Sequence, residues 1–375
     1  MNTHRESAGQ VLWIGFEAEE WDGQLESLLR TIRPGGVIFF QRNIQNAEQF
    51  QGLVRRVAGF LLDNSGLPPF LAVDLEGGLV DRFREVLAPL ASVRQAVQAG
   101  MARELGRMAG REAAFFSLNV DFAPVLDVGS AESESVLGSR TAGESAEQVA
   151  RFGEEFLAGL AESGVLGCGK HFPGLGSGCL DSHLAMPRIE KDATQLWEHD
   201  LLPFRSLASR LPMVMVAHAA YPGLEAEASS GDRRSQSLPA SLSRQIVSGL
   251  LTQRIGYEGL VLSDDLEMGG VLEGRTVGEA AVAAIEAGCD MLLVCRRADY
   301  VQAAFEAIVR QAERDAAFRT AVDTAAQRVI RARQQLADPL SNRMPDGETL
   351  RGEIQALAAE IERRLSREAR KEIKA

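Results

Sequence analysis

The sequence lacks any long apolar run, which argues against a membrane-spanning helix. Although 45% of its 375 residues are hydrophobic, the polar start MNTHRESAGQ is followed by an apolar run of only six residues, VLWIGF. A membrane-spanning helix needs about 20 apolar residues, and a signal peptide has an apolar core of about 7–15. We therefore expect a globular protein of the cytoplasm with no membrane partner.

Cysteine is also scarce. The four cysteines, Cys168, Cys179, Cys289 and Cys295, fall in no CxxC spacing. Neither a zinc site nor a disulfide framework is indicated, so we expect no metal and no cofactor. Buried free thiols are the simplest interpretation, except that Cys179 lies near histidines that could activate it as a nucleophile.

Positive charge is in deficit as well. The chain has 40 Lys and Arg residues against 52 Asp and Glu residues, which gives a formal net charge of −12. Binding to nucleic acid needs a basic face that displaces counterions from the phosphates. The composition therefore argues against a nucleic-acid partner and favours a small or neutral substrate.

Eight short apolar runs occur along the chain. They are VLWIGF, GVIFF, FLAVDLE, NVDFAPVLDV, GVLGCGKHF, MVMVAHA, GLVLSDD and CDMLLVC. Longer segments between them have helical periodicity, as in residues 47–62, and the pairs Asn46/Gln49 and Ser145/Gln148 have the spacing of helix-capping boxes. Nearly all-apolar strands that alternate with amphipathic helices predict a parallel sheet covered on both faces.

Eight such strands in one domain predict an α/β fold of the closed (β/α)8 barrel type. An open doubly wound sheet is the alternative, but it normally carries a glycine-rich phosphate turn after its first strand. The segment WIGFEAEE has no such turn. In a barrel the chemistry lies where the strands end and the next loops begin.

The composition changes from about Pro345 onward. This region is rich in Glu and Arg, with apolar residues at helical spacing: Leu350, Ile354, Leu357, Ile361 and Leu365. We expect a catalytic barrel over residues 1–340 and one amphipathic helix within a C-terminal extension over 341–375. The apolar stripe can dock on the barrel or pair with a second copy, so both a monomer and a homodimer through this helix remain open.

Polar residues end most of the eight runs. They are Arg42, Asn43, Asp74, Glu76, Asp127, Lys170, His171, His218, Asp264 and Asp265. Any one of them could cap the next helix, and this is the better interpretation for Asn43 and Asp265 taken singly. Their convergence on one rim of a barrel predicts a functional site.

Four stretches could carry chemistry there. Asp264 could be a nucleophile, a metal ligand or a cap. In the loop KHFPGLGSGCLDSH, Asp181 could orient His183 as a proton shuttle. The same residues could instead form an Asx-turn with a solvent-exposed histidine.

The other two stretches contain possible ligand-binding groups. Lys170 could form a Schiff base, as in barrel aldolases, or donate hydrogen bonds to ligand hydroxyls together with His171. Asp74 and Arg82 flank a Gly-Gly turn, where they could form a simple ion pair or hold sugar hydroxyls.

Taken together, these stretches resemble glycoside hydrolase family three. The motifs that carry the resemblance occur in order from about Val11 to about Leu336: PGGVIFFQRN, VDLEGGLVDRF, NVDFAPVLDV, KHFPG, DSH, PASLS, GLVLSDDLEM and AGCDMLLV. The sequence is most similar to the single-domain bacterial β-N-acetylglucosaminidases of peptidoglycan recycling. The resemblance implies a TIM-like barrel.

The resemblance also implies residue roles. Asp264 corresponds to the catalytic nucleophile, and His183 to the acid/base with Asp181 as its partner. The sugar-binding positions correspond to Asp74, Arg82, Arg140, Lys170 and His171. The sequence departs from the family pattern at Leu75 and Leu79, where Gln and Arg are usual, and in the segment GLGSG, where relatives carry GHG.

We therefore expect a retaining exo-β-N-acetylglucosaminidase that acts on small soluble glycans such as muropeptide fragments. One alternative is a phosphorylase of the same family, which uses phosphate in place of water as the acceptor. Another is a β-glucosidase of the same family. An aldolase using Lys170 and a sugar-binding barrel without catalysis remain open too.

Overall fold

A computed structural model describes residues 3–131, 133–176, 186–226, 238–338 and 346–372. Eight parallel strands close into a barrel in the order β1-β10-β9-β8-β7-β6-β3-β2. Their bounds are β1 Leu12–Ile14, β2 Gly36–Ile38, β3 Phe70–Val73, β6 Val120–Asp121, β7 Leu166–Phe172, β8 Met213–Val216, β9 Leu260–Asp265 and β10 Met291–Val294. Each predicted apolar run contains one of these strands, so the (β/α)8 prediction is confirmed.

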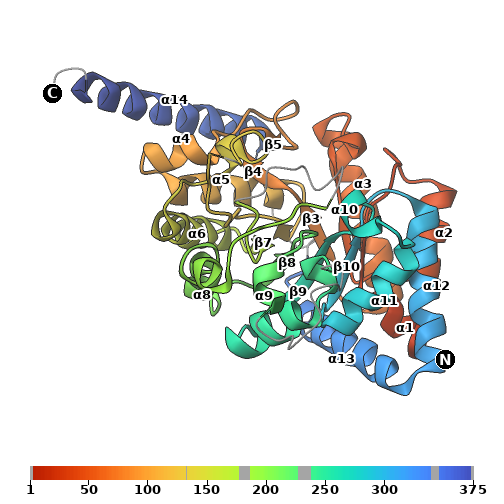
Figure 1. The fold of residues 1–375 in the computed structure, drawn as a ribbon. Coiled ribbons are helices and arrows are strands. Elements are labelled where there is room, and N and C mark those ends of the chain that lie inside the picture. The colour runs from red at the N-terminus through yellow and green to blue at the C-terminus, as the bar shows by residue number, and fades with distance from the viewer. Residues whose placement is uncertain (1–2, 132, 177–185, 227–237, 339–345, 373–375) are drawn as a thin grey trace.

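Helices surround the barrel (Figure 1). The longer ones are α1 Thr3–Gln10, α2 Gly23–Ile32, α3 Ala47–Ser65, α5 Ala102–Phe115, α6 Ala146–Ala161, α11 Val277–Ala287, α12 Ala298–Arg314, α13 Ala316–Arg333 and α14 Gly347–Glu372. The shorter ones are α4 Val93–Gln98, α7 Ala193–Gln195, α8 Leu202–Leu207, α9 Pro222–Ala226 and α10 Gly269–Leu272. Single 3-10 turns are η1 Gln41–Asn43, η2 Gly138–Arg140 and η4 Ala240–Leu242, and π-helical segments are η3 Leu196–Asp200 and η5 Gln245–Arg254.

The predicted helix starts are present. The Asn46 side chain caps α3 by accepting a hydrogen bond from the Gln49 backbone N–H, and Ser145 caps α6 in the same way through Gln148. These caps satisfy donors that the first turn of a helix leaves unpaired.

Side chains along the strands alternate between two cores. On β9, Leu260 and Leu262 point into the barrel, whereas Val261 packs outward against the helices. The barrel interior is filled by a cluster that includes Trp13, whose ring lies 5.2 Å from the ring of Phe70 and 4.9 Å from that of Phe122. This period of two decides which residues at the strand ends face the barrel axis.

A small hairpin that the sequence pattern does not predict follows β3. It is made of β4 Leu75–Gly77 and β5 Val80–Asp81, which pair in antiparallel fashion. Gly77 and Gly78 form its turn with φ values of 90° and 60°, a region that glycine adopts at no steric cost. A Cβ at Gly77 would lie 2.3 Å from the backbone oxygen of Ala91, so the turn requires glycine for space as well.

The C-terminal helix α14 extends along one side of the molecule past α4 and α5 (Figure 1). Its predicted apolar stripe is buried against the chain's own core: Leu350, Ile354, Leu357 and Ile361, with Leu365 partly buried. An Arg111–Glu353 ion pair adds to this contact. The boundary at residue 340 stays a prediction, because it falls outside the described residues. Among the helices that the structure describes, none has the length and apolar character to cross a bilayer.

Candidate active site

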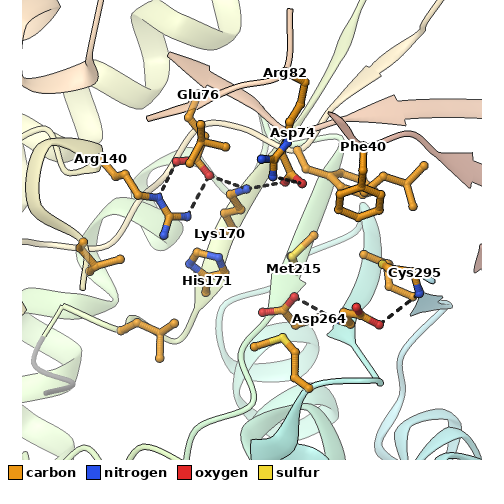
Figure 2. A pocket seen from close by; sticks show the side chains of 18 of the residues that line it. Phe40, Asp74, Glu76, Arg82, Arg140, Lys170, His171, Met215, Asp264 and Cys295 are labelled. Carbon is orange, nitrogen blue, oxygen red and sulfur yellow. Dashed lines mark hydrogen bonds and ion pairs between the residues drawn. The ribbon is translucent and has the colours of Figure 1, made fainter. Parts of the chain in front are cut away.

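A cavity of about 250 Å³ opens at the carboxyl ends of the barrel strands. Its lining includes every predicted site residue that the structure describes: Asp74, Arg82, Arg140, Lys170, His171 and Asp264. Figure 2 shows these side chains converging from different strands and loops. The predicted convergence on one rim is therefore a property of the fold, while the role of each residue stays a prediction.

The strand register explains why these side chains meet. Asp264 follows the inward-facing Leu262 by two residues, and Asp74 follows the inward-facing Ala72 by the same step. Lys170 stands in the same relation to Cys168 on β7. A polar residue that lies two positions after an inward-facing apolar residue at the end of a strand therefore points into the cavity.

Lys170 lies between two carboxylates. Its Nζ is 2.9 Å from Oδ1 of Asp74 and 2.7 Å from Oε1 of Glu76. The Lys170 and Glu76 side chains are only 3% and 1% exposed, so both charges are removed from solvent. Burial of charge is tolerated because each partner neutralises the other and completes its hydrogen bonds.

Two arginines extend this chain of charges. Arg140, from the turn η2, donates from Nε and a terminal nitrogen to the two oxygens of Glu76 at 2.7 and 2.9 Å. At the other end, a terminal nitrogen of Arg82 lies 3.5 Å from Oδ2 of Asp74. We call these five residues, Arg82, Asp74, Lys170, Glu76 and Arg140, the paired cluster.

The cations decide the charge state of the paired cluster. Burial alone would raise the pKa of Asp74 and of Glu76, but Lys170 and the neighbouring arginine outweigh it and lower both pKa values. Burial would likewise lower the pKa of Lys170, yet the two carboxylates raise it. Lys170 is therefore held as an ammonium ion, which disfavours the Schiff-base alternative because that chemistry needs the free amine.

His171 is oriented by a buried carboxylate. Its Nδ1 lies 2.8 Å from Oδ2 of Asp127, and its backbone N–H donates to Oδ1 of Asp127 at 3.2 Å. The same Oδ1 accepts a hydrogen bond from the backbone N–H of Leu175 at 2.7 Å. With Nδ1 directed to Asp127, the other ring nitrogen is left to serve a ligand.

Asp264, the last residue but one of β9, lies on the side of the cavity across from the paired cluster (Figure 2). Its Oδ1 accepts a hydrogen bond of 2.8 Å from the backbone N–H of Asp265. The hydroxyl of Ser263 donates to the Asp264 carbonyl at 2.8 Å, which fixes the backbone. A carboxylate held in this way faces a cavity that contains cationic donors for a polar ligand.

Asp265 does not cap the next helix, α10, whose N-cap is Met268, and it lines the cavity instead. Its Oδ1 accepts hydrogen bonds from the backbone N–H groups of Glu267 at 3.0 Å and Cys295 at 3.2 Å. Burial raises the pKa of Asp265 to about 7, and the charges of Glu267 and Asp264 act in the same direction. Asn43, the other residue expected to cap a helix, does not cap α3, which Asn46 caps; its side chain is buried and donates to the carbonyls of Phe16 and Ala18.

Some of the predicted site residues cannot be placed in the described structure. Asp181, His183 and Cys179 lie outside the described residues, as do Ser177 and Gly178 of the altered loop. The remaining cysteines, Cys168, Cys289 and Cys295, are buried and free, as expected. Leu79, one of the departures from the family pattern, is 75% exposed at the hairpin turn.

Three contributors to the site are not predicted from the sequence. Glu76 and Asp127 are polar strand ends for which the sequence suggests no role, and Phe40 is an apolar residue that lines the cavity. The period of two along β2 could have found Phe40, which follows the inward-facing Ile38. In the parts of the chain that are described, no group of three or more His, Cys, Asp or Glu side chains is arranged to hold a metal ion.

The chain matches the family described as "Glycosyl hydrolase family 3 N terminal domain" over residues 3–332. It belongs to glycoside hydrolase family 3. A β-hexosaminidase from Alkalilimnicola ehrlichii is 37% identical over 303 residues, which cover 78% of this chain and 82% of that protein. A β-hexosaminidase from Idiomarina loihiensis is 34% identical over 299 residues, with coverage of 78% and 86%.

Solved structures of the family have the same fold. A family 3 β-N-acetylglucosaminidase from Paenibacillus sp. str. FPU-7 aligns with a TM-score of 0.83 and 30% identity, over 93% of this chain and 68% of that one. A β-N-acetylhexosaminidase from Beutenbergia cavernae aligns with a TM-score of 0.78 and 26% identity, over 88% of this chain and 98% of that one. The chain is therefore a glycoside hydrolase, and the two relatives from Alkalilimnicola ehrlichii and Idiomarina loihiensis are named as β-hexosaminidases.

Proposed function

We propose that the protein is a retaining exo-β-N-acetylglucosaminidase that removes terminal β-linked N-acetylglucosamine from small soluble glycans such as muropeptide fragments in the cytoplasm. The observation that carries the proposal is the single cavity in which Asp264 faces the paired cluster. The similarity to β-hexosaminidases supports the choice of sugar.

The size and polarity of the cavity suit one sugar ring. A volume of about 250 Å³ lies just below the range of about 300–1,000 Å³ that drug-sized ligands occupy, which favours a terminal residue over an internal one. Charged donors and acceptors with fixed positions bind hydroxyls well, because an analogue without the hydroxyl leaves them unpaired. In this proposal Lys170, Asp74, Arg82, Arg140 and His171 hold the non-reducing sugar.

The reaction then proceeds by two displacements. A carboxylate oxygen of Asp264 bonds to the anomeric carbon while the glycosidic C–O bond breaks, and the leaving oxygen takes a proton from His183. In the second step water attacks the same carbon, gives its proton to His183 and releases Asp264, so the β configuration is retained. Asp181 is the partner that keeps His183 cationic by charge proximity.

The oligomeric state follows from α14 in this proposal. Its apolar stripe is already covered by the chain's own helices, so we propose a monomer rather than a dimer formed by that stripe.

The test is turnover of an aryl β-N-acetylglucosaminide beside the matched aryl β-glucoside. We expect the acetamido sugar to be preferred and Asp264→Asn to abolish the activity. A preference for the glucoside contradicts the choice of sugar, and saccharide binding without turnover contradicts catalysis altogether. Sugar 1-phosphate as the main product at millimolar phosphate would identify a phosphorylase instead.

A further inference from the structure

A buried histidine lies behind the proposed nucleophile. His218 follows β8 and is 0% exposed, and it does not line the cavity. Its Nδ1 is 2.7 Å from the hydroxyl oxygen of Ser241, itself fully buried in η4, and its Nε2 is 3.0 Å from the backbone oxygen of Asp265. The ring thus bridges η4 and the end of β9.

The partners determine where the hydrogens lie on this ring. A carbonyl oxygen only accepts hydrogen bonds, so Nε2 of His218 carries the hydrogen and donates it to Asp265. In the neutral ring Nδ1 is then an acceptor for the Ser241 hydroxyl. Burial lowers the pKa of His218, which agrees with the neutral form, although the charge of Asp264 opposes that shift.

The bridge reaches Asp264 through one residue. The backbone carbonyl of Asp265 is held by His218, and its backbone N–H donates to Oδ1 of Asp264 at 2.8 Å. Asp265 is therefore fixed on one side by the histidine and orients the Asp264 carboxylate on the other.

We infer that His218 is a positioning residue for Asp264, and that Ser241 supports it by donating its hydroxyl hydrogen to Nδ1, the ring nitrogen that carries no hydrogen. The inference rests on the proposed role of Asp264 as the nucleophile. His218 touches neither the cavity nor the reacting atoms, so it acts on the rate of attack and not on the affinity for sugar. A displacement of a reacting group by about 1 Å lowers a rate by about 10²-fold.

The experiment compares His218→Leu with His218→Gln. The leucine removes the donor to Asp265, whereas the glutamine amide nitrogen replaces Nε2. An N-acetylglucosaminyl donor with an activated leaving group, fluorinated to slow the second step, reports the first-order rate at which Asp264 becomes labelled at saturation. We expect the leucine variant to be labelled about 10²-fold more slowly and the glutamine variant to recover most of the rate.

Two further measurements separate positioning from general damage. The Kd for free N-acetylglucosamine is expected to change less than about 3-fold in both variants, since the sugar contacts are intact. Tyr257→Phe is the matched control, because it removes a buried hydroxyl near the start of β9 that donates to the backbone oxygens of Leu211 and Leu260. Its labelling rate should equal that of the unmodified protein.

The outcomes are distinct. If the unmodified protein is labelled on a residue other than Asp264, the proposed function is wrong. If Asp264 is labelled in the unmodified protein and equally fast in His218→Leu, the inference about His218 is overturned while the function stands. If the leucine variant does not fold, Ser241→Ala replaces it, with an expected slowing of about 5-fold for one lost hydrogen bond; an unchanged rate overturns the inference.

Discussion

Two groups of buried carboxyl groups lie close together in this barrel but differ in charge. In the paired cluster, Asp74 and Glu76 share Lys170 and are flanked by arginines. The second group, which we call the acid cluster, consists of Asp81 on β5, Glu112 on α5 and Asp121 at the end of β6. It has no cation in contact with its oxygens among the described residues.

The hydrogen bonds of the acid cluster come from the backbone. Asp121 accepts from the N–H of Leu75 at 2.9 Å through Oδ1, while its Oδ2 has no partner in the described structure. Both oxygens of Glu112 are also unpartnered there, although the side chain is 0% exposed. Burial raises the pKa of Glu112 well above its usual value, and the charges of Asp81 and Asp121 add to it.

The comparison shows that burial alone does not set the charge of a carboxyl group. Burial raises the pKa in both groups, but in the paired cluster the adjacent cations reverse its effect. The paired cluster therefore presents fixed charges to the cavity, whereas Glu112 has no adjacent cation to reverse the rise of its pKa. Substitutions that remove the cation from the paired cluster, or the ionisable group from the acid cluster, test whether adjacent cations decide the charge.

The largest effect is expected for Lys170→Met, which leaves Asp74 and Glu76 buried without their shared cation. Removal of one partner of a buried ion pair destabilises a fold by about 3–5 kcal/mol. We also expect kcat/KM to fall by about 10⁴-fold, as for a lost hydroxyl contact in a polar site. Urea unfolding and aryl-substrate kinetics at pH 7 measure both.

Lys371→Met, which breaks an exposed pair with Glu368, is the control and should change neither stability nor kcat/KM. Equal effects of the two variants would refute the distinction between buried and exposed ion pairs.

Glu112→Gln tests the acid cluster. Because the folded pKa of Glu112 is raised, its contribution to stability is full below the unfolded pKa near 4.5 and is lost as the pH rises toward the folded value. The glutamine has no proton to lose, so the variant should become more stable than the unmodified protein as the pH rises above about 5, by up to about 1.4 kcal/mol per pH unit. Urea unfolding from pH 4 to pH 8 measures this difference. A difference that does not change with pH would mean that Glu112 is ionised in the fold.

Arg140→Lys keeps the charge beside Glu76 but removes the two-pronged hydrogen bond. Hydrogen bonds to charged groups contribute about 1.5–3 kcal/mol, so we expect a loss of stability in that range together with a raised KM. Arg297→Lys is a matched control, because Arg297 also donates from Nε and a terminal nitrogen to both oxygens of one carboxylate, Asp299, at 3.0 and 2.6 Å but at an exposed position. There the loss should be smaller, because solvent screens an exposed ion pair. Equal losses at both positions would show that burial does not matter.

The smallest effect on stability is expected for Arg82→Gln. Arg82 stands at the open end of the paired cluster, 28% exposed, and its contact with Asp74 is long at 3.5 Å. A loss of less than about 1 kcal/mol is expected from thermal or urea unfolding, since Lys170 still neutralises Asp74. A loss as large as that of Lys170→Met would place the essential cation at Arg82 instead.

The sequence predicted the strands because each is a nearly all-apolar run between amphipathic segments. It did not predict β4 and β5, which are too short and too polar to give such a run. The inward-facing positions of Asp74, Lys170 and Asp264 follow from the strand period, so these residues could be placed on one rim.

Side-chain contacts between residues that lie far apart in the sequence could not be predicted from the strand period. The contact of Glu76 with Arg140 joins residues 64 positions apart, and that of His171 with Asp127 joins residues 44 apart. Glu112 lies at helical spacing from the buried Leu105 and Met108, so the helical period places it on the buried face of α5, but the sequence does not show which groups meet it there. The charge state of each cluster depends on these long-range contacts and needs the fold.

The most direct test of the account is the identity of the residue that forms the covalent intermediate. The protein is incubated with the fluorinated N-acetylglucosaminyl donor, digested, and analysed by mass spectrometry, with Asp264→Asn as the control. The account predicts one sugar adduct on the peptide that contains Asp264, its absence in the asparagine variant, and a β product by NMR with the natural sugar. An adduct on any other peptide, or an inverted product, would contradict it.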